Sequence, residues 1–256
     1  MEGAKKTGKA YVGTSGWSYD DWVVRFYPED VRKKDWFEYF VKHFSTVELN
    51  ATYYRLFPAK TFQLWHDKAP KNFTYAVKMW RMVTHLKRLR DADDATQTVL
   101  ERAALLGRNL GPILVQLPPS LRRDDELLDE YLLVLRHIRQ AIGMRMKFAF
   151  EFRHASWMDD AVYAILKRHR AALCLPDGPQ PEWPRVVTSN FTYVRFHGRP
   201  NTDSMYTEPM LAEWAQWMKP KLSSGIDVYA YFNDDYKAHA VVNARQLREL
   251  LKVKNL

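Results

Sequence analysis

The sequence predicts an α/β fold, a single (β/α)8 barrel of the TIM type, from two features of its hydrophobic pattern. Eight short apolar segments alternate with seven longer amphipathic segments along a chain of 256 residues, and this alternation is typical of such a barrel. Within the short segments, polar residues share one parity and gather toward the C-terminal end, where a TIM barrel carries its active site. A doubly wound sheet is the alternative, and it usually has fewer strands.

The expected elements follow in chain order. The predicted strands are residues 11–15, 46–50, 74–79, 113–117, 148–153, 172–175, 193–197 and 228–233. The predicted helices are residues 34–44, 59–69, 91–106, 124–140, 160–170, 208–222 and 238–251. The fourth helix has an apolar stripe and acids in its first turn, where the helix dipole favours them. After the sixth strand, residues 176–184 contain four prolines, so we expect an irregular segment in place of a helix there.

Composition and sequence pattern limit the classes of protein to which this chain can belong. We expect residues 1–10 to be a flexible N-terminus and residues 11–256 to form one domain, because no linker, repeat or composition shift interrupts them. No signal-peptide pattern and no apolar run of about 18 residues is present, so a cytoplasmic location without a membrane partner is predicted. The single cysteine, Cys174, excludes a disulfide framework. A net charge of +9 favours acidic partners such as nucleic acid or phosphorylated metabolites. The oligomeric state stays open.

Strand parity selects the candidate site. Alternate side chains of a strand face opposite sides, and the inward parity holds Glu48, Lys78, Glu151, Arg195 and His197. We expect them at the C-terminal mouth of the barrel. Glu48, Glu151 and His197 are the predicted catalytic residues, because paired carboxylates and an imidazole suit acid/base chemistry. The alternative is a structural network in which the glutamates only neutralise buried cations.

Cations and polar groups around this mouth predict an anionic substrate. Lys78, Arg153 and Arg195 outnumber the two inward glutamates, and arginine offers a bidentate fork to phosphate or carboxylate. The full set of predicted substrate-binding residues is Asn50, Tyr54, Lys78, Gln116, Arg153, His154, Trp157, Arg195 and Asn233. Aromatic residues beside arginines in the strand-end loops, such as Tyr53 and Arg81, suit stacking of bases or sugars, or they are lids over the barrel.

No cofactor is predicted. The weaker alternative is a divalent metal held by Glu151, Asp177 and His197, since hard carboxylates with one imidazole suit manganese, magnesium or zinc. The basic stretches 87–90, 122–123 and 167–170 lie on or beside predicted helices, and we interpret them as solvated helix faces.

Six motifs together resemble the YecE-like family, a barrel family known as a domain of unknown function. They are VGTSGWSY (12–19), VELNATYYR (47–55), PILVQLPP (112–119), EFRHASW (151–157), YVRFHG (193–198) and YFNDD (231–235). The resemblance implies a TIM-type barrel and no particular reaction. The sequence departs from the family pattern in the loop of residues 199–206 and at Asp234, where asparagine is commoner.

These observations lead to one preferred function and one from another class. The preferred function is metal-independent acid/base hydrolysis, at a phosphate or glycosidic centre, of a small molecule or nucleic acid that carries an anionic group. The alternative is a nucleic-acid-binding protein without catalysis that uses the same cationic and aromatic surface. An anion-sensing or scaffold barrel is a third possibility.

Overall fold

The computed structural model describes residues 7–178, 183–198, 205–233 and 236–253. Most of the 199–206 loop and Asp234 therefore lie outside the described residues. Eight strands close into a barrel in sequence order, which confirms the TIM-type fold. The strands are β1 (Ala10–Ser15), β2 (Thr46–Leu49), β3 (Thr74–Lys78), β4 (Leu110–Gln116), β5 (Phe148–Glu151), β6 (Ala172–Asp177), β7 (Phe191–Phe196) and β8 (Asp227–Phe232).

All seven predicted helices are present, with ends shifted by a few residues. The α-helices are α1 (Trp36–Phe40), α2 (Ala51–Tyr54), α3 (Ala59–Lys68), α4 (Asp93–Ala104), α5 (Asp125–Ile142), α6 (Asp160–His169), α7 (Glu208–Ser223) and α8 (His239–Leu250). The short α2 was not predicted, because one turn is too short to show a hydrophobic period. No helix among the described residues is long and apolar enough to cross a membrane.

Contacts between residues divide the chain into two compact units. The first unit consists of Met1–Glu48, Leu175–Trp183 and Asn190–Leu256. The second unit consists of Leu49–Cys174 and Pro184–Ser189.

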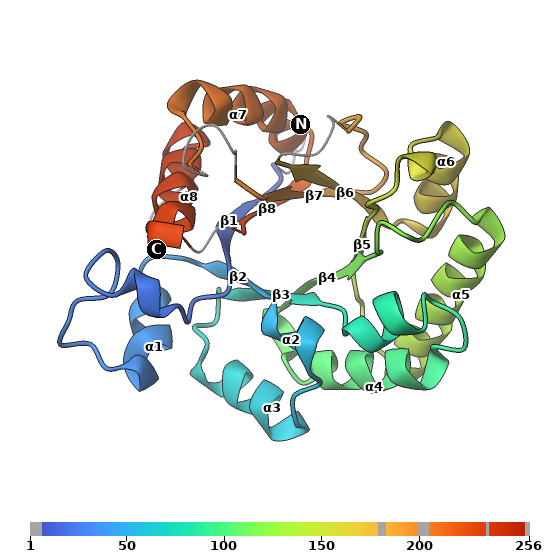
Figure 1. Cartoon of the computed structure of the whole chain (residues 1–256), viewed down its shortest axis with the longest axis horizontal. Coiled ribbons are helices and arrows are strands. Elements are labelled where there is room, and N and C mark those ends of the chain that lie inside the picture. The colour runs from blue at the N-terminus through green and yellow to red at the C-terminus, as the bar shows by residue number, and fades with distance from the viewer. Residues whose placement is uncertain (1–6, 179–182, 199–204, 234–235, 254–256) are drawn as a thin grey trace, which may run out of the picture. The chain divides into compact units, whose positions relative to one another are not determined.

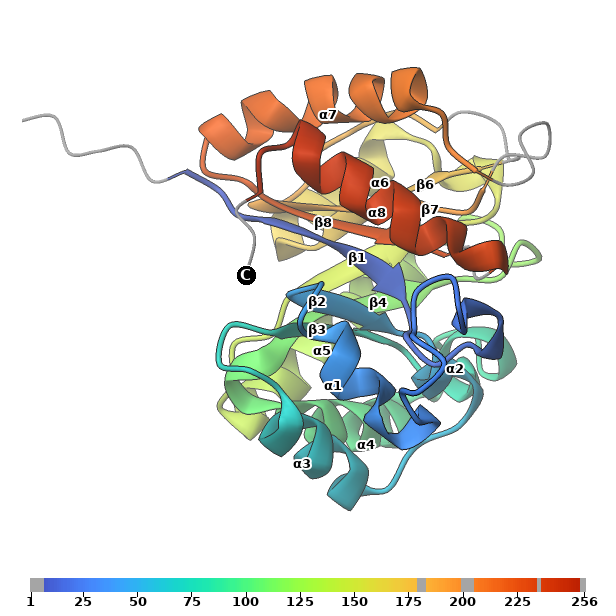
Figure 2. The ribbon, with the colours of Figure 1, turned by 90° about the vertical axis from the view of Figure 1, so that its left-hand side faces the viewer.

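In the first unit, β1 pairs in parallel with β2 and β8, and β8 pairs with β7. Helices α7 and α8 pack against each other and against these strands (Figures 1 and 2). Phe196 and Phe232 end β7 and β8 and stack with ring centroids 4.3 Å apart. On the opposite parity, the hydroxyls of Thr46 and Tyr231 lie 2.7 Å apart, and both side chains are buried. Apolar side chains thus pack toward the helices while polar side chains share the other face.

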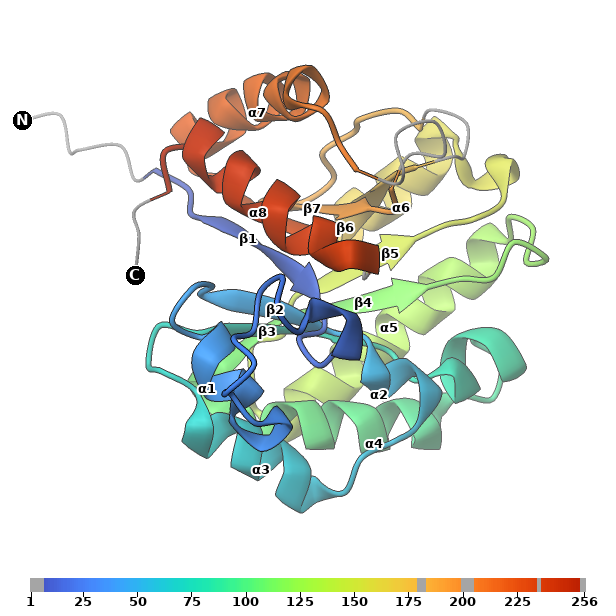
Figure 3. The ribbon, with the colours of Figure 1, turned by 60° about the vertical axis from the view of Figure 1, so that its left-hand side comes forward.

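In the second unit, β3, β4, β5 and β6 pair in parallel, and α3, α4, α5 and α6 follow one another on their outer side (Figure 3). Helix α5 shows why the sequence folds this way. The Asp124 side chain accepts a hydrogen bond from the Leu127 amide at 3.0 Å and caps the first turn. Gly143 ends the helix with φ of +73°, a left-handed conformation that suits glycine. The apolar stripe predicted between these ends is buried.

The connection between β6 and β7 agrees with the predicted irregular segment. Its described residues, 178 and 183–190, contain no helix. The predicted strand end was wrong, because Pro176 lies inside β6, which continues to Asp177. A proline is tolerated there because it lies near the end of the strand.

Candidate functional site in the second unit

Three polar side chains end neighbouring strands of the second unit. Lys78 ends β3, Gln116 ends β4 and Glu151 ends β5. Gln116 is the register partner of Glu151, and Lys78 is the partner of Leu114, so the three ends lie close together along the sheet. Lys78 is 7% exposed and Glu151 is fully buried. Buried charges of this kind need partners.

Lys78 finds an aromatic partner on α2. Its Nζ lies 4.3 Å from the ring centroid of Tyr53, within cation–π range. The hydroxyl of Thr52 contacts the backbone oxygens of Leu49 at 2.6 Å and Lys78 at 2.7 Å. This hydroxyl fastens α2 to the ends of β2 and β3, so it positions the Tyr53 ring over the ammonium group.

Glu151 contacts one cation and one thiol. Its Oε1 forms a short ion pair with Nη2 of Arg153, and the Cys174 thiol donates toward its Oε2 at 3.9 Å. The Arg153 side chain remains 15% exposed, whereas the carboxylate has no exposure. The carboxylate is therefore buried behind a guanidinium group that still reaches solvent.

His85 joins this group from the turn after β3, in a π-helical segment at Met82–Leu86. Its ring lies 5.0 Å from that of Tyr53. Burial lowers the pKa of His85 below its ordinary value of 6.5, and three nearby cations lower it further: Lys78, Arg81 and Arg153. A cation disfavours the protonated imidazole, so the positive charge of Lys78, Arg81 and Arg153 adds to the effect of burial on His85. His85 was missed by sequence reasoning, since nothing in its spacing connects it to the strand ends.

Two further predicted residues of the second unit, Asn50 and Tyr54, differ in how far they are exposed to solvent. Asn50 directly precedes α2, and its buried Oδ1 has no hydrogen-bond partner among the residues described. Native structures rarely leave such an atom unsatisfied without a ligand or water nearby. Tyr54 is 65% exposed and contacts Tyr53 edge-on. Asn50 thus has an unused acceptor, and Tyr54 presents its ring to solvent.

The loop after β5 uses two predicted residues for its own structure. His154 accepts a hydrogen bond from the Ser156 amide at 3.1 Å and caps the following turn. Trp157 is fully buried, stacks on Phe152 at 4.5 Å and donates from its indole to the Leu121 oxygen at 2.8 Å. In this structure Trp157 therefore packs the loop and offers no surface to a substrate.

In the first unit, Glu48 and Arg195 form a fully buried ion pair. Arg195 donates to both carboxylate oxygens over 2.8–3.2 Å. Ser15 donates to Oε1 at 2.6 Å, and Tyr193 donates to Oε2 at 2.7 Å. Burial acts to raise the pKa of Glu48, but the charge and hydrogen bonds of Arg195, aided by both hydroxyls, lower it below its ordinary value. The arrangement keeps this carboxylate ionised.

His197 and Asn233 follow β7 and β8 of the same unit, and their Nδ1 and Nδ2 atoms lie 3.3 Å apart. Asp177 ends β6, and its carboxylate accepts from the Trp214 indole and, at 3.4 Å, from the Tyr206 hydroxyl. These bonds fasten the end of β6 to α7. Within the described ranges, no group of three or more His, Cys, Asp or Glu side chains is arranged to hold a metal ion. The metal alternative stays a prediction.

Fold and geometry thus define a TIM-type barrel protein with charged and amide side chains at the C-terminal ends of its strands. The chain belongs to the family described as "Protein of unknown function DUF72", whose model matches residues 11–256. This match confirms the resemblance that the six motifs indicated.

Relatives and solved structures agree with this assignment. The chain is 25% identical to the UPF0759 protein YunF of Bacillus subtilis, over 95% of both chains, and 25% identical to YecE of Escherichia coli over 56% of this chain and 48% of that one. A DUF72 family protein from Thermotoga maritima superposes with a TM-score of 0.82 and 30% identity, covering 95% of this chain and 99% of that one. SacUVDE shares the fold at a TM-score of 0.56 and 14% identity, covering 96% of this chain and 100% of that one.

Proposed function

We propose that the second-unit strand ends bind the phosphate group of an anionic substrate and hydrolyse its ester bond by acid/base chemistry without a metal. The observation that supports this most is the positive potential at His85, whose pKa is lowered by burial and by Lys78, Arg81 and Arg153. Three cations that act on one imidazole match a phosphate better than a neutral ligand.

Each side chain then has a role that its position allows. Lys78 and Arg153 hold phosphate oxygens, and the amides of Asn50 and Gln116 orient the substrate. Glu151 takes a proton from the attacking water as the new P–O bond forms. It returns that proton to the leaving oxygen as the ester bond breaks, so charge and atoms balance.

The first-unit residues have proposed roles of a different kind. Glu48 already accepts hydrogen bonds from Arg195, Ser15 and Tyr193, and a lowered pKa makes it a weak base. We assign it the positioning of Arg195. Substrate binding by Arg195, His197 and Asn233, proton transfer by His197, and the cytoplasmic location remain predictions.

Inorganic phosphate and the His85 ring provide the test. Because a bound anion offsets the three cations, phosphate should raise the pKa of His85 toward its ordinary value, followed by NMR titration of the ring protons. Lys78→Met should raise this pKa without phosphate and weaken the phosphate effect. Lys71→Met, which removes an exposed lysine before β3, is the matched control and should change neither. No phosphate effect in the wild type, or the same change in both variants, contradicts the proposal.

Turnover tests the chemistry separately. We expect slow hydrolysis of para-nitrophenyl phosphate or its diester, unchanged by a chelator and lost in Glu151→Gln, while phosphate still shifts the His85 pKa. Hydrolysis that is as fast in Glu151→Gln as in the wild type excludes the proposed role of Glu151. Tight, strongly salt-dependent binding of DNA without turnover, weakened equally by Lys71→Met and Lys78→Met, instead supports the non-catalytic nucleic-acid binder.

A further inference from the structure

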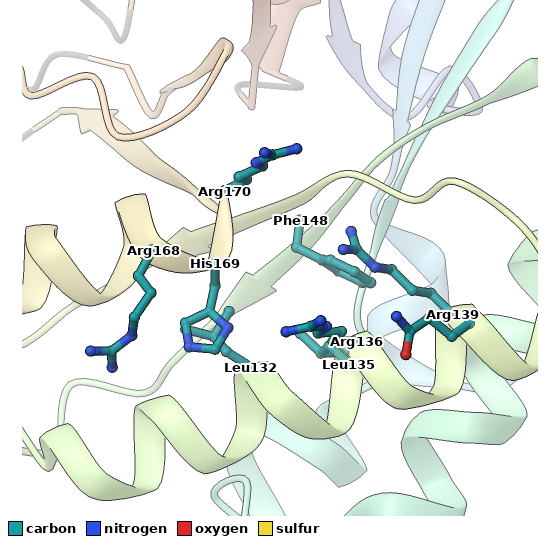
Figure 4. Close-up of a pocket in the computed structure, with 9 residues that line it drawn as sticks. Leu132, Leu135, Arg136, Arg139, Phe148, Arg168, His169 and Arg170 are labelled. Atoms are coloured by element: carbon teal, nitrogen blue, oxygen red, sulfur yellow. The ribbon is translucent and has the colours of Figure 1, made fainter.

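A second cluster of cations lines a pocket in the second unit, away from the strand ends described above. The pocket has a volume of about 360 Å³ and lies between the C-terminal half of α5, the start of β5 and the end of α6 (Figure 4). Phe148 begins β5 and lines the pocket, whereas Glu151 ends the same strand. The pocket therefore lies toward the opposite end of β5 from the candidate catalytic carboxylate.

The pocket combines an apolar floor with basic walls. Leu132, Leu135 and Phe148 are each at most 6% exposed and form the floor. Four arginines line the walls: Arg136, Arg139, Arg168 and Arg170. Figure 4 shows Arg136 and Arg139 extending from α5 near the Phe148 ring and His169 at the end of α6, while the Arg168 side chain points away from that ring. Residues 167, 168 and 170 are exposed, in agreement with the predicted solvated face, and residues 168–170 also line the pocket.

One carboxylate neutralises only part of this charge. Asp129 pairs with Arg168 at 2.5 Å and with His169 at 2.6 Å. Arg139 donates to the backbone oxygen of Met146 at 3.3 Å. Within the described part of the chain, neither Arg136 nor Arg170 forms an ion pair with an acid. Two guanidinium groups are therefore available to an anion.

The stability of α5 and α6 explains the positions of some of these basic residues but not of Arg136 and Arg170. Basic residues in a last helical turn complement the helix dipole, which explains Arg139, Arg168 and His169. Arg136 lies before the last turn of α5. Arg170 follows α6 with φ of +57°, a left-handed conformation in which glycine costs less than arginine. Neither the helix dipole nor the backbone conformation therefore accounts for Arg136 and Arg170, and both line the pocket.

We propose that this pocket binds the phosphate group of a small organic phosphate, at a site separate from the strand-end site. The forks of Arg136 and Arg170 match the oxygens of a phosphate dianion. The floor of Leu132, Leu135 and Phe148 accepts the apolar part of the same molecule. A concave site of this size fits a phosphate monoester better than a nucleic-acid backbone, which spreads its phosphates over an extended surface.

Calorimetric binding of phenyl phosphate to the full chain tests the proposal. Arg136→Gln and Arg170→Gly should each weaken binding about ten-fold, because each removes a charge-assisted contact. Glycine suits the backbone at position 170, so Arg170→Gly keeps the fold and isolates the side chain. Lys167→Gln removes an exposed charge from α6 without touching the pocket lining and should leave the affinity unchanged. Lys78→Met should remove only the binding event that belongs to the strand-end site and leave the event that Arg136→Gln and Arg170→Gly weaken, which separates the two sites.

Three results would overturn the inference. The first is the absence of phenyl phosphate binding in the wild type at low salt. The second is an equal loss of affinity in Lys167→Gln and Arg136→Gln, which means diffuse electrostatics. The third comes from a DNA duplex tested in parallel: if only the duplex binds, and Arg136→Gln and Arg170→Gly weaken it, the surface is a nucleic-acid contact.

Discussion

Glu48 in the first unit and Glu151 in the second are both buried, both lie in the C-terminal half of a strand and both pair with an arginine, but their surroundings differ. Glu48 accepts from Arg195, Ser15 and Tyr193, and the Arg195 side chain is 1% exposed. Glu151 pairs with Arg153, whose side chain is 15% exposed. In the first pair both charges are sealed, while in the second the cation reaches solvent. An ion pair that is closed on both sides suits architecture, and one that is open on the cationic side suits an anionic ligand.

The strand-end site of the second unit also carries an excess of positive charge, which the Glu48–Arg195 pair does not. Lys78, Arg81 and Arg153 act together on His85 and lower its pKa. In the first unit, Glu48 neutralises the charge of Arg195, and Arg195 in turn lowers the pKa of Glu48. The exposure of the arginine partner and the surplus of positive charge, rather than the presence of a buried glutamate, are therefore what distinguish the proposed binding site from the Glu48–Arg195 pair.

The largest expected effect is the loss of stability when the fully buried Glu48–Arg195 ion pair is broken. Glu48→Gln should lower the free energy of unfolding by about 3–5 kcal/mol, because Arg195 would stay buried without its counter-charge. Urea denaturation measures this loss. Tyr193→Phe keeps the ring and removes one donor, so it should cost only about 1 kcal/mol. A loss in Glu48→Gln no larger than that of the control contradicts the structural role.

The corresponding change in the open pair should cost less. Glu151→Gln should lower the free energy of unfolding by about 1 kcal/mol, since water and anions can screen the partly exposed Arg153. Added phosphate should stabilise this variant more than the wild type, because a competing negative charge has been removed. Urea melts with and without phosphate compare the two. If Glu151→Gln lowers the free energy of unfolding as much as Glu48→Gln does, and phosphate does not restore it, then Glu151 is also a structural residue.

The sequence predicted the parts of this comparison that depend on strand periodicity. Alternation alone identified Glu48, Lys78, Glu151 and Arg195 as inward residues, because parity depends only on neighbouring positions. It did not distinguish the two glutamates. The hydroxyls that seal Glu48 belong to residues 33 and 145 positions away, and such long-range contacts leave no local pattern.

Loops were predicted less well than strands for the same reason. His85 lies in a single π-helical turn, where no period of apolar residues points to one side. Trp157 was predicted to bind substrate from its place after β5, yet its indole donates to Leu121 and is sealed. The direction of a loop side chain depends on what packs against it, and sequence position does not reveal that.

The smallest expected effect is a pH dependence of stability that comes from His85 at the strand-end site. The folded protein lowers the pKa of His85 below 6.5, so below that pH the unfolded chain binds more protons at this residue than the folded chain. Stability should therefore fall as the pH drops below about 6.5 toward the folded pKa, and this part of the slope should be absent from His85→Gln. Phosphate should reduce the slope in the wild type, because an anion beside Lys78 and Arg153 makes protonated His85 less unfavourable. Denaturation of both proteins across this pH range measures the difference. Identical slopes for wild type and His85→Gln would mean that the cations do not act on this imidazole and that the strand ends do not form an anion site.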